Sequence, residues 1–149
     1  MTDSTQVTNY LGALTAVLIN VLLIALFIAR LSHRPRIEYW LGIVIILGIV
    51  PLCYLFITAI GLKRPPLYFI QIGLMIAYLV VELLVDYVLK VEFRQTQSLV
   101  IPYIVLFFAG TGGMIGVASH AGKAWTIVTV ISFLIMAMLS FIQRHITGQ

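Results

Sequence analysis

The stretch QIGLMIAYLVVELLVDYVLK, residues 71–90, places two carboxylates, Glu82 and Asp86, inside an otherwise apolar segment. A helix of about 20 apolar residues crosses the roughly 30 Å hydrocarbon core of a bilayer, so this segment has the length of a membrane span. A charged side chain at the centre of such a span costs about 2.5–3.5 kcal/mol on insertion scales. The two acids are therefore the residues that packing explains least, and the functional argument starts from them.

The composition of the whole chain is that of a membrane protein. Of its 149 residues, 62% are hydrophobic and 9% are charged, and the mean hydropathy is +1.12. A soluble domain of this composition would expose large apolar patches to water. Five apolar runs predict an all-α integral membrane protein, a bundle of five transmembrane helices over residues 7–29, 39–62, 67–89, 99–119 and 124–142. We expect one transmembrane domain over residues 1–149, in a plasma or inner membrane.

Basic residues mark the ends of the apolar runs, which is a signal of topology rather than of nucleic-acid binding. One side of the membrane would carry Arg30, Arg34, Arg36, Lys90, Arg94 and Arg144, and the other Lys63, Arg64 and Lys123. Because cytoplasmic loops are enriched in Lys and Arg, this bias predicts an N-terminus outside and a C-terminus in the cytoplasm. The first apolar run lacks an Ala-x-Ala-like cleavage site, so we expect it to be retained as a span.

The third span carries a polar face along its length. Gln71, Met75, Tyr78, Glu82 and Asp86 follow one another at intervals of three or four residues. At about 100° of rotation per residue, they fall within roughly 80° of one another on a helix. This face predicts a binding site for a ligand, a proton or a cation.

Depth in the membrane separates the two acids. With about 1.5 Å of rise per residue, Asp86 lies ~6 Å from the level of Lys90 and Glu82 lies ~12 Å from it. Asp86 can thus reach the membrane interface, whereas Glu82 must be protonated, paired or in contact with water. Two carboxylates one turn apart also repel each other, so the pair could share one proton near neutral pH.

Three interpretations of the acids stay open. In the first they are structural, and stabilise the bundle through ion pairs and hydrogen bonds; the candidate partners are Lys90, Arg30, Arg36, Asn20, Thr58 and Ser132. In the second, Glu82 carries a proton or a cation in transport, with Tyr78 as its hydrogen-bond partner. In the third, the acids bind an amine, or serve an embedded enzyme as proton donor and acceptor for a lipid-like substrate.

Two further features of the early spans carry expectations. Asn20 lies near the middle of the first span, where it either hydrogen-bonds a neighbouring helix or joins Glu82 in one cavity. Pro51 lies near the centre of the second span and removes a backbone hydrogen bond, which predicts a kink near Leu47.

The segment AGTGGMIG, residues 109–116, is the most glycine-rich part of the chain. Gly112 and Gly116 have the GxxxG spacing that lets membrane helices approach closely, with Ala109 and Gly113 on the adjoining ridge. The pattern predicts tight packing within the bundle, or against a second copy or a partner membrane subunit. An opened helix whose free carbonyls line a site is the alternative.

The remaining reactive residues point to no metal or cofactor. Cys53 is the single cysteine, and the predicted topology separates His33 and His145 from His120. An inner-face metal site from His33, His145, Glu38 and Glu92 has no supporting ligand spacing.

In size and helix count the chain resembles the translocator-protein group of five-helix ligand-binding bundles. In its acids within a small bundle it is similar to emopamil-binding-like sterol isomerases. Neither likeness includes a shared motif, so no residue role follows from it.

Overall fold

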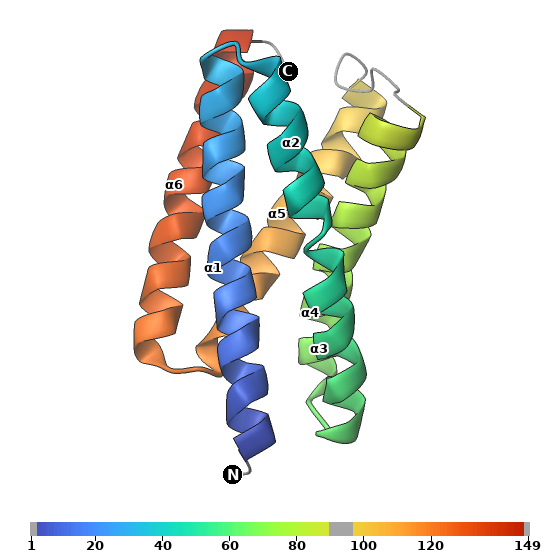
Figure 1. The fold of residues 1–149 in the computed structure, drawn as a ribbon, viewed down its shortest axis with the longest axis vertical. Helices are drawn as coiled ribbons and strands as arrows, with labels where there is room; N and C mark the ends of the chain where they lie inside the picture. Colours follow the sequence, from blue (N-terminus) through green and yellow to red (C-terminus); the bar gives the residue numbers. More distant parts are fainter. Residues whose placement is uncertain (1–2, 90–96, 148–149) are drawn as a thin grey trace.

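The computed structural model describes residues 3–89 and 97–147, and these residues are helical apart from short turns. In chain order they form α1 (Asp3–Leu31), α2 (Pro35–Ile46), α3 (Ile49–Gly61), α4 (Pro66–Glu82), the π-helix η1 (Leu83–Val88), α5 (Gln97–Ser119) and α6 (Lys123–Thr147) (Figure 1). Five helical segments are long and apolar enough to cross a membrane, with α2 and α3 forming one and α4 and η1 another. The expected all-α fold with five such segments is confirmed.

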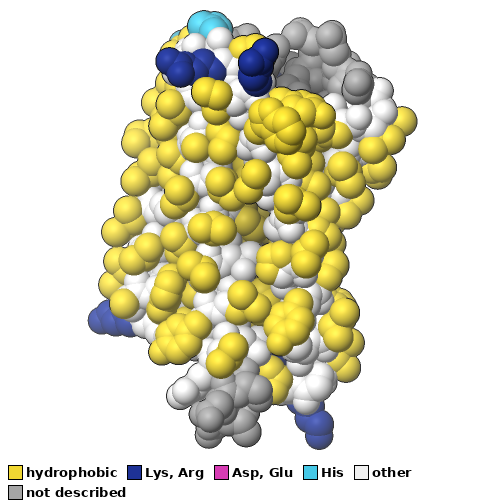
Figure 2. Space-filling model, in the orientation of Figure 1, with side chains coloured by type: hydrophobic (Ala, Val, Ile, Leu, Met, Phe, Trp, Pro, Cys, Tyr) yellow, Lys and Arg dark blue, Asp and Glu magenta, His cyan; other side chains and the backbone are white. Residues whose placement is uncertain are grey.

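The helices run up and down, and α5 crosses the others obliquely. Figure 1 shows α1 between α6 on one side and α2 and α3 on the other, while α5 runs behind them from the level of η1 to the start of α6. The two termini lie at opposite ends of the molecule. We call the end that carries Arg30, Arg34, Arg36 and Arg144 the basic end, and the other the opposite end. Figure 2 shows hydrophobic side chains covering the visible face between Lys and Arg groups at both ends.

The second span is broken where Pro51 predicts a kink. Helix α2 ends at Ile46 and α3 begins at Ile49. Proline has no N–H to donate to the Leu47 carbonyl, and that carbonyl instead accepts from Val50 at 3.1 Å. The Gly48 N–H donates to the Ile45 carbonyl at 2.9 Å, so the break is a short tightened turn between two helices on nearly the same path. The helix is thus interrupted at the place where the sequence predicts a kink, near Leu47.

The turns after α1 and after α3 have the same backbone geometry. His33 and Lys63 both adopt a φ of 55°, the left-handed conformation that usually falls to glycine at the end of a helix. In each turn the next residue, Arg34 or Arg64, donates its N–H to a carbonyl five residues back, at 3.0 and 3.1 Å. These bonds satisfy helix carbonyls that would otherwise lack a partner, and reverse the chain before the next helix.

Glycines of α5 bring it close to α4, its most extensive neighbour. A Cβ at Gly110 would lie 3.2 Å from Met75 Cα and 3.3 Å from the Leu74 carbonyl oxygen, so the two backbones nearly touch there. Gly113 and Gly116 lie against the Gln71 side chain, whereas Gly112 faces Phe133 of α6 at an ordinary distance of 3.9 Å. The close approach to α4 therefore involves Gly110, Gly113 and Gly116, at a spacing of three residues, while Gly112 faces α6.

Candidate functional site

Glu82 lies at the junction of α4 and the π-helix η1, and is 6% exposed. The wider turn is marked by the Leu89 N–H, which donates to the Leu84 carbonyl at 2.7 Å, five residues back. Such π-helical turns are rare and recur at functional sites. Asp86 lies within the π-helix η1 and is only half-buried.

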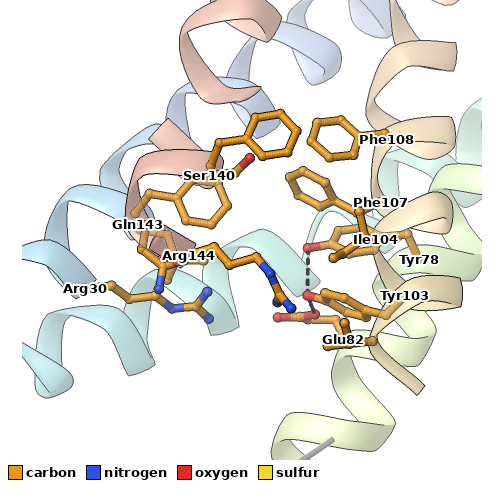
Figure 3. A pocket seen from close by; sticks show the side chains of 14 residues that line it. Arg30, Tyr78, Glu82, Tyr103, Ile104, Phe107, Phe108, Ser140, Gln143 and Arg144 are labelled. Atoms are coloured by element: carbon orange, nitrogen blue, oxygen red, sulfur yellow. Dashed lines mark hydrogen bonds between the residues drawn. The ribbon is translucent and has the colours of Figure 1, made fainter. Parts of the chain in front are cut away.

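A tyrosine from another helix contacts the Glu82 carboxylate. The Tyr103 hydroxyl of α5 donates to Glu82 Oε2, and the Tyr78 hydroxyl lies 3.5 Å from the Tyr103 hydroxyl (Figure 3). Tyr78 was expected to bond Glu82 itself, but it is fully buried one step further away. The three groups form a polar line from α4 to α5 and back to α4.

These groups line a cavity between α1, α4, α5 and α6, here called the aromatic cavity. It offers about 60 Å³ to the centres of water molecules, where one water needs roughly 10–15 Å³ by the same measure. Its chemistry is set by Arg30, Tyr78, Glu82, Tyr103, Phe107 and Arg144. Figure 3 shows Arg30 and Arg144 on the side facing Tyr78, Glu82 and Tyr103. The cavity is thus narrow, and polar groups gather at one end of it.

Aromatic rings build the remainder of the wall. The Phe107 ring meets the rings of Phe27, Tyr78 and Phe108 edge-on, with centroids 6.1, 5.2 and 5.0 Å away. Phe108 of α5 stacks on Phe141 of α6 at 5.5 Å and 17°. Edge-to-face and offset-stacked pairs are the favoured arrangements of such rings, so the wall is fixed in shape.

The two arginines of the cavity differ in their partners. Arg30 Nε donates to Glu38 Oε1 of α2 at 2.6 Å, and its guanidinium lies 5.8 Å from the Phe27 ring centroid. Arg144 forms no ion pair within the described residues, 3–89 and 97–147. Arg30 is therefore held by Glu38, whereas the Arg144 side chain lines the aromatic cavity and extends toward the Glu82 carboxylate (Figure 3).

Glu82 also lines a second cavity, here called the acidic cavity, between α1, α2 and the α4–η1 junction. It offers about 300 Å³ by the same measure, and its other charged groups are Arg30, Glu38 and Asp86. The Tyr87 hydroxyl donates to the Tyr39 carbonyl oxygen at 3.1 Å beside it. Glu82 and Arg30 thus separate an aromatic cavity from an acidic one, and Asp86 belongs to the acidic cavity alone.

The other predicted site residues lie elsewhere. Asn20 is 1% exposed and donates to Ser132 Oγ of α6 at 3.0 Å, so it links two helices and lines neither cavity with Glu82. Gln71 lies against Gly113 and Gly116 and lines no described cavity. Lys90, a proposed partner of the acids, lies outside the described residues, as do Glu92 and Arg94. Ala109 is half-buried on α5.

Sequence reasoning missed Tyr103 and Arg144. Tyr103 lies in the first two turns of a span, where an aromatic residue is ordinarily an interfacial anchor. Arg144 lies near the end of the last span, where its charge serves as a topology signal. Pro102 marks the first turns of this helix in the sequence. Nothing in the sequence shows that the helix runs obliquely and brings Tyr103 to Glu82. The described residues contain no group of three His, Cys, Asp or Glu arranged to hold a metal.

Comparison with known proteins gives no match to a family model, to a curated protein or to a solved structure.

Proposed function

We propose that the chain is an integral membrane protein, with its basic end in the cytoplasm, that binds a small amphipathic molecule in the aromatic cavity. The observation that carries this proposal is the cavity itself, lined by Tyr78, Glu82 and two arginines at one end and by phenylalanines elsewhere. Ligand sites are typically apolar concavities with a few convergent polar groups that orient the ligand.

The cavity volume favours a slender ligand. Space for the centres of only a few water molecules accommodates one alkyl chain more readily than a fused ring system. A molecule bound there would place its chain among Phe27, Phe107 and Phe108 and its polar group near Glu82 and Arg144.

Photolabelling in lipid nanodiscs tests this proposal. A dodecyl amphiphile with a diazirine in its chain should label α1, α5 and α6 residues that line the aromatic cavity, as mapped by peptide mass spectrometry. Ile104→Trp, which places an indole in the cavity, should abolish that labelling. Ile101→Trp is the matched control, since Ile101 is exposed on the same helix and lines no described cavity. Labelling that is unchanged by Ile104→Trp would contradict the proposal.

Proton- or cation-coupled transport is a second candidate, favoured by the position of Glu82 in the walls of both cavities. A carboxylate exposed to two cavities in turn is the arrangement that a carrier of protons or cations requires. In proteoliposomes, Glu82→Gln should then abolish the coupled flux while the protein stays folded. Absence of flux in the wild-type protein, or equal flux in the variant, would reject transport and leave ligand binding intact.

A further inference from the structure

We propose that the ligand of the aromatic cavity is a membrane amphiphile with a single apolar chain and an anionic head, and that Arg144 binds that head. The inference rests on the proposed function, because it presumes that the cavity binds a ligand, and it adds the chemical class of that ligand.

The charges around the cavity favour an anionic head. Arg30, Arg144 and Glu82 are the charged groups that line the aromatic cavity, and Arg30 pairs with Glu38 of α2. Figure 3 shows the Arg144 side chain extending toward the Glu82 carboxylate, which accepts from Tyr103, and Arg144 forms no ion pair among the described residues. A guanidinium without an ion-pair partner is stabilised by an anion that reaches it. A phosphate or carboxylate would also suit the fork of donors on a guanidinium.

The arrangement of neighbouring cavities suits a head and a chain in one molecule. A third cavity opens at the basic end, and its polar lining consists of Arg30, His33, Arg34, Gln143 and Glu38, whose carboxylate pairs with Arg30. Arg30 and Gln143 also line the aromatic cavity, so the two cavities share one wall. An anionic head at that shared wall would lie between polar groups and water, and its chain would extend among the phenylalanine rings.

The path of α5 provides a route from the bilayer. Helices α5 and α6 are close at the turn that joins them and separate toward the basic end (Figure 1). Between them the stacked Phe108 and Phe141 rings border the aromatic cavity, and Phe141 is 61% exposed. Val105 and Met138 add further exposed apolar surface on the same two helices. A single chain can therefore reach the cavity sideways from the leaflet at the basic end, which in a cytoplasmic orientation is rich in anionic lipids.

Competition against the diazirine amphiphile tests the head group. Dodecyl phosphate, dodecyltrimethylammonium and dodecyl maltoside share one chain and differ in charge, and nanodiscs of neutral phosphatidylcholine keep the background constant. We expect dodecyl phosphate to compete at roughly tenfold lower concentration than the other two, the typical effect of a hydrogen bond to a charged group. Arg144→Gln should remove this preference. Arg36→Gln, which removes the same charge from an exposed position lining no described cavity, should keep it.

Each other outcome overturns the inference in a distinct way. Equal competition by the three amphiphiles, with labelling still abolished by Ile104→Trp, would reject the anionic head and leave ligand binding intact. A preference that survives in Arg144→Gln would reject the role of Arg144. Inorganic phosphate that competes as well as dodecyl phosphate would show a free anion as the ligand. The comparison of the three amphiphiles uses the wild-type protein, so its outcome does not depend on whether a variant folds. Labelling insensitive to Ile104→Trp would instead reject the proposed function itself.

Discussion

Tyr103 is the residue on which the local structure around Glu82 depends. Its hydroxyl donates to a carboxylate that is 6% exposed, and hydrogen bonds to a buried charged group are among the stronger ones in proteins. We expect Tyr103→Phe to lower the free energy of unfolding by about 1–3 kcal/mol, since a buried acceptor loses a donor. Tyr78→Phe should cost less, because its 3.5 Å contact to Tyr103 is at the limit of hydrogen bonding. Unfolding by SDS in mixed micelles, followed by circular dichroism, measures both. Equal losses of stability in the two variants would contradict the conclusion that the Tyr103–Glu82 hydrogen bond is the stronger of the two.

His120, at the opposite end, predicts a pH dependence of stability. Burial lowers its pKa, and the nearby Arg64 guanidinium lowers it further. The unfolded chain, in which histidine titrates near about 6.5, then binds a proton at a pH where the folded chain does not. The free energy of unfolding should fall as the pH drops through the pKa of His120 in the unfolded chain. It should stop falling once the pH is below the pKa of His120 in the folded chain. The midpoint of unfolding should therefore be lower at a pH below about 6.5 than at a pH above it. His120→Asn should remove the part of this difference that comes from His120. An unchanged profile in His120→Asn would contradict the prediction.

At the scale of the elements, the two matching turns carry a backbone cost. His33 and Lys63 both hold a positive φ with a side chain that disfavours it. Glycine has no such penalty, so His33→Gly and Lys63→Gly should each raise the free energy of unfolding by up to about 1 kcal/mol. Ser32→Gly, one residue earlier and not at a positive φ, should not stabilise the protein. The same SDS titration measures all three, and a loss of stability in both turn variants would refute the argument.

Packing between α4 and α5 predicts different effects of alanine at two nearby glycines of α5, Gly110 and Gly112. Gly110→Ala should destabilise by about 1–3 kcal/mol, because its Cβ would press on the backbone of Met75 and Leu74, which cannot rotate away. Gly112→Ala meets only the edge of the Phe133 ring at 3.9 Å and should be neutral or slightly stabilising. Thermal unfolding in nanodiscs distinguishes the two. A larger loss of stability in Gly112→Ala than in Gly110→Ala would show that the contact of α5 with α6 at Gly112 is tighter than its contact with α4 at Gly110.

Across the whole molecule, the apolar runs of the sequence were enough to place the helices but not the site. Apolar length alone locates all five membrane-length segments, and the largest error is at the last, expected to end at 142 and observed to end at Thr147. Pro51 revealed the break in the second span because its effect is local. The partner of Glu82 depends instead on the oblique path of α5, which brings Tyr103 across to α4. The π-helix that begins after Glu82 and contains Asp86 likewise has no marker in residue type or spacing.

Orientation in the membrane links this fold to the proposed ligand. The basic end carries Arg30, Arg34, Arg36 and Arg144 in the described residues, against Lys63, Arg64 and Lys123 at the opposite end. Of the latter, Arg64 donates to Asn9 of α1 and lies over the Tyr68 ring, so part of its charge is engaged within the bundle. The positive-inside rule thus favours the basic end in the cytoplasm, beside the anionic leaflet.

Reporter fusions at the C-terminus test this orientation directly. Because the C-terminus lies at the basic end, a fused green fluorescent protein should fluoresce and a fused alkaline phosphatase, active only outside the cytoplasm, should be silent. Arg34→Gln combined with Arg36→Gln reduces the charge bias and should yield a mixed population with phosphatase activity. Lys123→Gln increases the difference in positive charge between the two ends. All molecules should then keep the basic end in the cytoplasm, without phosphatase activity. Phosphatase activity in the unmodified chain would place Arg144 on the outer side, away from the anionic leaflet, and would remove the membrane source proposed for an anionic ligand.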